Sequence, residues 1–300
     1  MNIEPVIKQI FLFGREFDEG FRESFGLLFN QLLAYGVEVR IFSPLKDFIL
    51  PWTDKRSASC KEFQSYEDLI GLEGVMFSIG GDGTFLEAVT LVRDLPIPLA
   101  GINSGRLGFL ADISQDEISV AVDAILQNRT GFDERALLQV DSEHPLFGGF
   151  NYALNEITVH KRDDSSMIKI NAFLDGQFLN TYWADGLIVA TPTGSTAYSL
   201  SVGGPLVLPN TNTIILSPIA PHNLTVRPLV FNDSMRLSLQ VESRNGNMLV
   251  SADSRSVVMK DRLELTINKA PFHLKTIRLR EQNFYQTLRS KLMWGADRRN

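Results

Sequence analysis

The feature that most constrains the fold is an apolar segment, residues 75–79, that runs directly into Gly-Gly-Asp-Gly-Thr at residues 80–84. The apolar segment predicts a buried strand, and residues 85–92 carry a helical pattern. Glycines leave the backbone bare of side chains, so a polyphosphate can approach the N–H groups of such a turn, where the helix dipole also favours negative charge. The motif therefore predicts an anion site at the end of a strand.

The first part of the chain alternates strand and helix patterns. Apolar stripes at helical spacing and short apolar runs follow one another at residues 10–13, 21–32, 37–42, 75–79, 85–92, 99–102 and 114–127. This alternation is typical of a parallel α/β sheet. We therefore expect an α/β, Rossmann-like domain over residues 1–130.

From about residue 137 the pattern changes to short alternating segments separated by turn residues. Asp175-Gly176 and Asn245-Gly246 each lie between two such segments and predict hairpin turns. We expect a mostly antiparallel β domain over residues 131–280. The tail, residues 281–300, turns helical, and its apolar face is expected to pack back on the N-terminal domain or on another subunit.

Composition limits the function classes. The 300 residues include 44% apolar and 21% charged residues, which suffices for a full core. A net charge of −6 argues against a nucleic-acid partner. With one cysteine, Cys60, no intrachain disulfide can form, and we find neither a secretory signal nor an apolar run long enough to span a bilayer. These observations predict a cytoplasmic protein without a membrane partner.

The Gly80–Thr84 motif contains one residue that a phosphate site does not need. Asp82 repels phosphate, so it either accepts a proton from an attacking hydroxyl, or holds a divalent cation, or caps the following helix. The motif lacks the Gly-Lys-Ser/Thr of a Walker A loop and the glycine spacing of the dinucleotide fingerprint.

A family resemblance adds to this interpretation. Gly-Gly-Asp-Gly-Thr after a strand is similar to the phosphate loop of NAD kinases, of diacylglycerol and sphingosine kinases and, in a variant form, of phosphofructokinases. Further segments resemble the NAD kinase family and follow its order along the chain: residues 101–110, 154–156, 185–205, 217–222 with Arg227-Pro228, and 288–295.

The resemblance implies an ATP-dependent kinase that phosphorylates the 2′-hydroxyl of the adenosine ribose of NAD to give NADP. It also implies a divalent metal, Mg²⁺ or Mn²⁺, arriving with ATP, and assembly as a homodimer or homotetramer. NAD is expected to lie across the junction of the two domains. A lipid or sugar kinase with the same loop and a non-catalytic NAD(H)-binding sensor are the alternatives. The choice between NAD and NADH, the range of phosphate donors and any allosteric regulation stay open.

The resemblance also assigns roles to individual residues. The expected catalytic residue is Asp82, and the expected phosphate and ATP ligands are Gly80, Gly81, Gly83 and Thr84. The expected NAD ligands are Asp82, Gly83, Asn155, Glu156, Asp185, Thr193, Thr196, Ala197, Tyr198, Ser201, Ala220 and His222. Tyr198 can stack on adenine, and Asn155 with Glu156 can bind ribose hydroxyls. No residue is expected to be a fixed metal ligand.

One segment departs from the family pattern. Asp253-Ser254-Arg255 stands where many members have Asp-Gly. Serine can replace glycine unless the backbone needs a positive φ. We assign this segment no role from the sequence.

Overall fold

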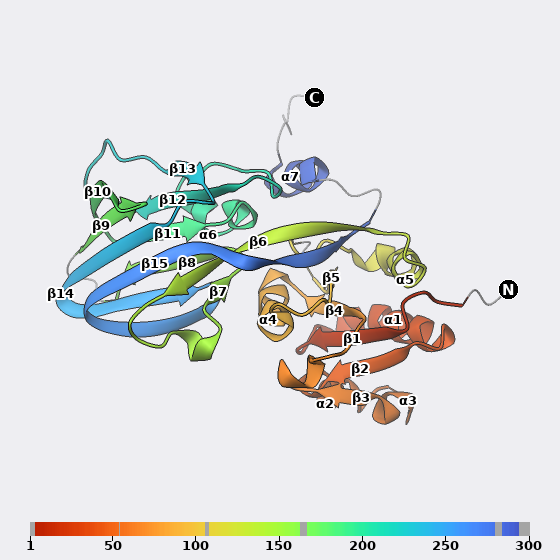
Figure 1. Ribbon diagram of the computed structural model, residues 1–300. Helices are drawn as coiled ribbons and strands as arrows, with labels where there is room; N and C mark the ends of the chain where they lie inside the picture. The colour runs from red at the N-terminus through yellow and green to blue at the C-terminus, as the bar shows by residue number, and fades with distance from the viewer. Residues whose placement is uncertain (1–3, 54, 106–107, 163–166, 280–283, 294–300) are drawn as a thin grey trace. The chain divides into compact units, whose positions relative to one another are not determined.

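The computed structural model describes residues 4–53, 55–105, 108–162, 167–279 and 284–293 (Figure 1). The chain divides into two compact units: an α/β unit of residues 1–134 and 274–300, and a β unit of residues 135–273. Two parts of the motifs that resemble NAD kinases, Arg106-Leu107 and Trp294-Gly295, lie outside the described residues. No helix in the described part of the chain is long and apolar enough to cross a membrane.

The α/β unit is built on a parallel sheet with the strand order β5-β4-β1-β2-β3. Its strands are β1 (Gln9–Gly14), β2 (Glu38–Phe42), β3 (Lys61–Phe63), β4 (Val75–Gly80) and β5 (Leu99–Asn103). Its helices are α1 (Arg22–Ala34), α2 (Ser43–Ile49), α3 (Lys55–Ser59), α4 (Asp82–Val92), α5 (Ile118–Leu126) and α7 (Phe284–Leu292), with 3-10 turns η1 (Glu19–Phe21), η2 (Glu67–Leu69) and η3 (Gln115–Glu117).

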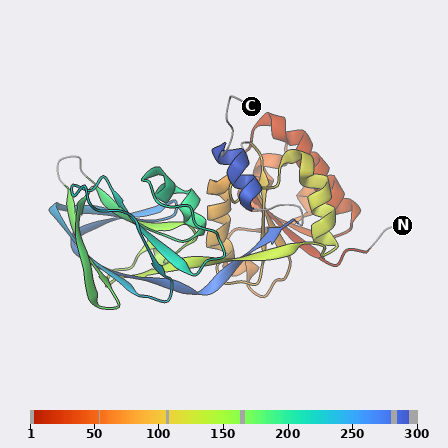
Figure 2. The ribbon, with the colours of Figure 1, turned by 90° about the horizontal axis from the view of Figure 1, so that it is seen from above.

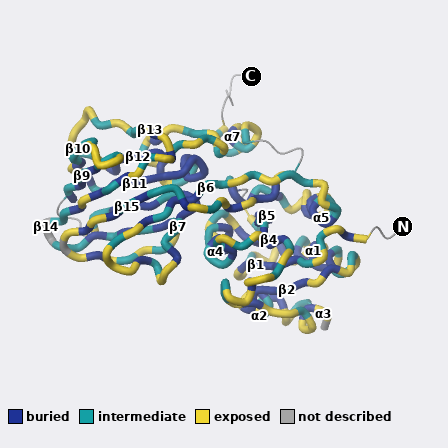
Figure 3. The backbone as a smooth tube through the Cα atoms, in the orientation of Figure 1, coloured by how far each residue is buried: buried dark blue, intermediate teal, exposed yellow. Residues whose placement is uncertain are grey.

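The inner strands of this sheet are apolar because helices cover both of their faces. Every residue of β4 and β5 is buried, as the dark blue of Figure 3 shows along the inner strands. Helices α1 and α5 lie side by side (Figure 2), where the Gln31 amide donates to the carbonyl of Ser119 at 2.9 Å. The expected capping box is present at Ser114 and Glu117.

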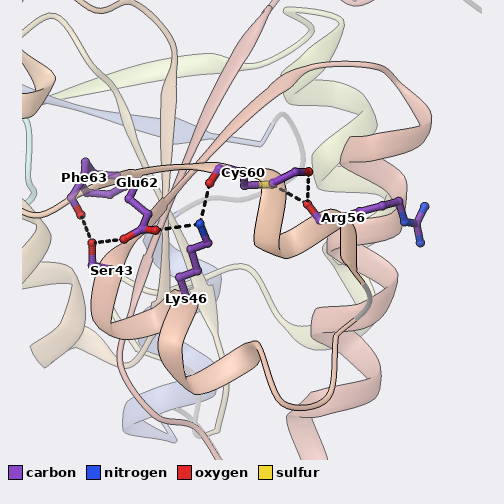
Figure 4. Close-up of polar contacts among 7 residues, drawn as sticks. Ser43, Lys46, Arg56, Cys60, Glu62 and Phe63 are labelled. Atoms are coloured by element: carbon purple, nitrogen blue, oxygen red, sulfur yellow. Dashed lines mark hydrogen bonds and ion pairs between the residues drawn. The ribbon is translucent and has the colours of Figure 1, made fainter.

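A polar cluster attaches the edge strand β3 to helix α2 (Figure 4). The Lys46 ammonium contacts the Glu62 carboxylate and the Cys60 carbonyl, both at 2.8 Å. The Ser43 hydroxyl donates to Glu62 at 2.8 Å. Cys60 is half-buried and its thiol donates to the carbonyl of Arg56 at 3.4 Å. The thiol therefore has a structural place in this cluster.

The β unit is mostly antiparallel, with β13, β12, β11, β8, β14 and β15 as successive neighbours. The elements after α5 are β6 (Gly131–Asp141), η4 (Phe147–Gly149), β7 (Tyr152–Ala153), β8 (Glu156–Lys161), β9 (Ile168–Leu174), β10 (Gln177–Ala184), β11 (Gly186–Ala190), η5 (Thr193–Thr196), α6 (Tyr198–Ser201), β12 (Thr213–Ile219), β13 (Leu229–Asn232), β14 (Leu237–Ala252) and β15 (Arg255–Arg278). Alternate residues of these strands form the main apolar core, and a smaller apolar cluster lies on β11 and β12. The parallel sheet of the α/β unit and the antiparallel β unit confirm the expected fold class.

The register of the sheet brings three loops of the β unit to one end. Strand β8 is antiparallel to both β11 and β14, with Glu156 opposite Ala190 and Ile157 opposite Ala252. The segment before β8 therefore lies beside the segments that follow β11 and β14.

Two expectations about local structure need correction. The hairpin expected at Asn245-Gly246 is wrong, because β14 runs through it; the register shifts between Glu242 and Asn247, and Gly246 has a φ of 74°. The two residues mark a bulge, where glycine also serves. The other hairpin is confirmed: Asp175 and Gly176 join β9 to β10 with φ of 49° and 79°.

The second correction concerns the start of the helix after β4. The sequence places its start at Phe85, whereas α4 begins at Asp82. The last three residues of the glycine motif thus form the first helical turn, where Asp is favoured by the dipole.

Candidate active site

The glycine motif forms an uncapped helix start in the α/β unit. Gly81 is the N-cap of α4, and a glycine has no side chain with which to cap the helix. Gly80 has a φ of 154°, and a Cβ there would lie 2.3 Å from the Thr84 hydroxyl, so packing demands glycine. A Cβ on Gly81 or Gly83 would meet nothing within 4 Å. These two glycines leave the helix N-terminus open on that side, as an anion site requires.

Asp82 fixes a distant loop through its carboxylate. Its Oδ2 accepts the N–H of Phe109 at 2.9 Å, and its Oδ1 accepts those of Leu110 and Ala111, both at 3.0 Å. A carboxylate has about four acceptor positions, so one position remains, on Oδ2. Asp82 therefore has a structural role that the sequence did not reveal, in addition to the proton acceptor, cation ligand or helix cap that it predicted.

The loop after β5 is shaped to reach Asp82. A Cβ on Gly108 would lie 1.8 Å from Asp82 Oδ1, and one on Gly101 would lie 2.5 Å from the carbonyl oxygen of Leu110. The Asn103 amide oxygen accepts the N–H of Gly105 at 2.8 Å. Gly101 and Gly108 of the segment that resembles NAD kinases thus serve close approach of backbone to backbone and to a carboxylate.

The β unit contains a second clamp of the same kind, which the sequence did not reveal. Asp253 Oδ2 accepts the N–H of Leu154 at 2.9 Å, and Oδ1 accepts those of Asn155 at 2.8 Å and Glu156 at 3.2 Å. Asp253 has a φ of 52°, whereas Ser254 is not among the described residues with positive φ. The serine that departs from the family pattern is thus compatible with the turn, and the strained position is held by the aspartate.

Glu156 has an unusual environment next to this clamp. Its Oε2 is buried and, within the described residues, has no hydrogen-bond partner. Burial and then the neighbouring Asp253 carboxylate raise the pKa of Glu156 to about 8, and a hydrogen bond from the Tyr198 backbone opposes this shift. Burial also raises the pKa of Asp253, while its three N–H donors oppose the rise. Because those donors favour a charged Asp253, Glu156 is the member of the pair that holds a proton at neutral pH.

The loop after β11 packs directly on the Leu154–Asn155 segment. The Thr191 hydroxyl donates to the carbonyl of Leu154 at 2.6 Å and accepts the N–H of Gly194 at 3.0 Å. A Cβ on Gly194 would lie 2.1 Å from the carbonyl oxygen of Asn155. This loop, which includes Thr193, Thr196, Ala197 and Tyr198, is therefore brought next to Asn155 and Glu156, and the Tyr198 backbone forms a hydrogen bond with Glu156.

Several hydroxyls of this loop are used inside the protein. Ser195 exchanges hydrogen bonds with the backbone of Val207 at 3.1 Å, and the Ser199 hydroxyl contacts that of Ser217 at 3.1 Å. The Thr196 hydroxyl donates to the carbonyl of Thr193 at 3.2 Å. In contrast, Tyr198 is 40% exposed, and Ser201 is exposed as well. Tyr198 thus offers an accessible ring.

Three further expected ligands lie elsewhere in the β unit. Asp185 precedes β11, whereas Thr191 follows it, so the two lie at opposite ends of this strand. The Asp185 carboxylate forms an ion pair with Lys161 at 2.8 Å. Ala220 and His222 are exposed, and the His222 N–H donates to the carbonyl of Trp183 at 2.8 Å. The structure does not bring these residues to the Asn155–Glu156 end.

The Asp253 clamp leads to a stability prediction. Asp253→Asn keeps the shape but points an NH₂ group at one or more backbone donors. Leaving buried N–H groups unpaired should lower the free energy of unfolding by roughly 1–3 kcal/mol, measured by urea unfolding. Asp175→Asn is the matched control, because Asp175 is an exposed turn residue whose carboxylate accepts the N–H of Arg236. Equal, small losses in the two variants would show that the clamp is energetically unimportant.

Glu156 leads to a prediction about pH. Its folded pKa of about 8 exceeds the ordinary value of 4.5, so the folded protein keeps a proton that the unfolded chain has released. Stability should therefore fall as pH rises from about 5 to about 8. Glu156→Gln should flatten this fall, whereas Glu143→Gln, which changes an exposed glutamate, should not. Parallel profiles of melting temperature for wild type and Glu156→Gln would contradict the assignment.

Comparison with known proteins covers both units. Residues 68–130 match the ATP-NAD kinase N-terminal domain, and residues 154–279 match the ATP-NAD kinase C-terminal domain. An NAD kinase of Cytophaga hutchinsonii is 50% identical over 231 residues, which are 77% of this chain and 79% of that protein. An NAD kinase of Christiangramia forsetii is 39% identical over 298 residues, covering 97% of this chain and 100% of that protein.

Solved structures agree with these matches. Yeast NADH kinase complexed with NADH superposes with a TM-score of 0.87 at 22% identity, over 98% of this chain and 89% of that one; it shows the shared fold. An NAD kinase from Archaeoglobus fulgidus in complex with ATP gives a TM-score of 0.72 at 26% identity, over 94% of this chain and 99% of that one. With the sequence matches above, the chain belongs to the NAD kinase family.

Proposed function

We propose that this chain transfers the terminal phosphate of ATP to the 2′-hydroxyl of the adenosine ribose of NAD, giving NADP. The observation that carries the proposal is the open glycine turn at the start of α4, with an acceptor carboxylate on the same turn. Membership of the NAD kinase family indicates the reaction. The geometry supports separate roles in phosphate binding, in activation of the hydroxyl and in adenosine binding.

The α/β unit is proposed to hold the phosphates. The N–H groups at the start of α4 are available for phosphate oxygens, since the N-cap Gly81 has no capping side chain and, among the described residues, Gly81 and Gly83 leave open space. The Thr84 hydroxyl adds a further donor. Phosphoryl transfer depends mainly on positioning and charge neutralisation, which such a turn provides.

Asp82 is proposed to receive the 2′-hydroxyl. Its carboxylate still has one acceptor position on Oδ2, because three positions are occupied by backbone N–H groups. From that position it can orient the hydroxyl and accept its proton as the oxygen attacks the terminal phosphorus. The clamped loop holds the carboxylate in one orientation, which reduces the reorganisation needed for the reaction.

The β unit is proposed to bind the adenosine. Tyr198 offers an exposed ring for stacking on adenine, and Asn155 with Glu156 offers an amide and a carboxyl group to ribose hydroxyls. Glu156, when protonated, both donates and accepts, which suits a hydroxyl.

The divalent metal is proposed to arrive with ATP. In the described ranges no group of three or more His, Cys, Asp or Glu residues could hold a metal ion. Mg²⁺ or Mn²⁺ bound to the triphosphate would neutralise phosphate charge. The protein's own contribution is then the backbone cradle and Asp82.

We also propose a cytoplasmic homodimer or homotetramer without a nucleic-acid partner. Asp185 and His222 lie at the other end of β11 from Thr191, and the six residue steps from Asp185 to Thr191 span about 20 Å along an extended strand. In an oligomer Asp185 and His222 can contact a dinucleotide that is bound by another copy of the chain. An assembly would thus give these two residues the NAD-binding role that the resemblance implies.

One assay separates this function from its alternatives. The purified protein is incubated with ATP, Mg²⁺ and either NAD, NADH, diacylglycerol or no acceptor, and NADP is measured with an NADP-specific dehydrogenase. NADP formation that requires both NAD and ATP supports the proposal. Binding of NAD without product would indicate a sensor, and phosphorylation of the lipid would indicate a lipid kinase.

The Asp82 role gives a kinetic prediction. Asp82→Asn should lower kcat by roughly 10²–10⁴-fold, because the acceptor for the 2′-hydroxyl proton is lost. The variant also loosens the Phe109–Ala111 loop, so a control is needed. Asn103→Ala removes the amide that binds Gly105 in the same loop but leaves the carboxylate in place. If both variants lose kcat equally, the loop rather than the acceptor explains the effect.

The adenine placement gives a second prediction. Tyr198→Ala should raise the KM for NAD about tenfold or more, since base–aromatic stacking contributes roughly 1–3 kcal/mol. The melting temperature should change little because the side chain is 40% exposed. Phe178→Ala, which removes a ring that is 61% exposed on β10, serves as the control and should leave KM unchanged. An unchanged KM for the Tyr198 variant would mean that adenine binds elsewhere.

A further inference from the structure

Lys291 on α7 lies near the Gly80–Thr84 motif, since its charge interacts with that of Asp82. Its Nζ lies 5.3 Å from the centre of the Phe109 ring. Phe109 donates its N–H to Asp82 at 2.9 Å. The ammonium is thus held over the residue that orients the proposed acceptor carboxylate, and all of these groups belong to the α/β unit.

The charge of Lys291 is only partly compensated. The side chain is half-buried, and in the described part of the chain it forms neither a hydrogen bond nor an ion pair. Burial lowers the pKa of Lys291, and the nearby Asp82 carboxylate opposes this shift. An ammonium that is partly exposed and has three unused donors is available to the acceptor atoms of a ligand.

The surroundings specify the chemistry of that ligand. Next to Asp82, the open side of Gly81 and Gly83 and the uncapped start of α4 favour an anion. Lysine is a common phosphate-binding point charge. We propose that Lys291 binds the phosphoryl group that is transferred and neutralises charge on its oxygens during the reaction. This inference rests on the proposed function.

The reaction leaves the protonation state of Lys291 unchanged. A bond forms between the 2′-oxygen and the terminal phosphorus, and the bond from that phosphorus to the bridging oxygen breaks. The bonding electrons leave with ADP, and the hydroxyl proton goes to Asp82. Lys291 keeps its three protons throughout and stabilises charge on the equatorial oxygens, as a cation does in other phosphoryl transfers.

A second role for Lys291 is to anchor α7 by its contact with the Phe109 ring, worth about 0.5–1 kcal/mol at exposed sites. The substitution must therefore keep the apolar contact and remove only the charge. Lys291→Met does this, since the methionine stem and sulfur can pack against the ring. Arg289→Met is the matched control, because Arg289 is an exposed cation on the same helix.

The test combines kinetics with binding of inorganic tripolyphosphate, measured by calorimetry in the presence of Mg²⁺ and without NAD. For Lys291→Met we expect kcat to fall about 10²-fold, as with loss of one charge-stabilising donor, with an unchanged KM for NAD. Tripolyphosphate affinity should fall about tenfold. Lys291→Arg should recover part of both losses, and Arg289→Met should resemble wild type.

Two results would overturn the inference. Leu288, buried on α7, gives a variant that loosens the helix but keeps the ammonium, Leu288→Ala. If Leu288→Ala reproduces both losses and Lys291→Arg recovers neither, α7 packing is responsible and the inference is wrong. It is also wrong if Lys291→Met retains wild-type kcat and tripolyphosphate affinity. If wild type makes no NADP, the proposed function fails, whereas tripolyphosphate binding that depends on Lys291 still supports an anion site there.

Discussion

In each unit, an aspartate carboxylate accepts three consecutive backbone N–H groups of a distant segment and holds candidate site residues in place. Asp82 does this for residues 109–111, and Asp253 does it for residues 154–156. Loops carry backbone donors that are costly to bury unpaired, and a charged acceptor satisfies several of them at once. Each clamp turns a flexible connection into a fixed surface, so residues beside it, such as Glu156 and Phe109, acquire defined positions.

The glycines of the motifs that resemble NAD kinases are of two kinds. At Gly108 and Gly194 a Cβ would lie within about 2 Å of a carboxylate or a carbonyl oxygen, so the absence of a side chain permits the contact itself. At Gly81 and Gly83 the space is empty. Only the second kind leaves room for a ligand. The hydroxyls divide similarly: Ser195 and Ser199 support the loop, while Tyr198 remains exposed.

Sequence patterns predicted what depends on neighbours along the chain. The strand before Gly80, the stripe of α1 and the Asp175-Gly176 turn all follow from local periodicity or turn chemistry. The failures share a cause. Asn245-Gly246 has the local chemistry of a turn, but the pairing of β14 with β15 converts it to a bulge. Asp253 lies 97 to 99 residues from its partners, so no local pattern reveals the clamp. The sequence offered one sign of this clamp: Asp253 lies where the chain departs from the family pattern.

The two clamps also differ in what they do to a neighbouring group. Asp253 lies close to a second carboxyl group, Glu156, whose pKa is raised first by burial and then by the charge of Asp253. Asp82 lies near the Lys291 ammonium, whose charge it favours. The same backbone interaction therefore stands beside a carboxyl group with a raised pKa in one unit and beside an ammonium in the other. A neutral carboxyl group suits the hydroxyls of a ribose, and a cation suits the oxygens of a phosphate. The proposed roles of the two units, nucleoside binding and phosphate binding, thus agree with the group that each aspartate meets.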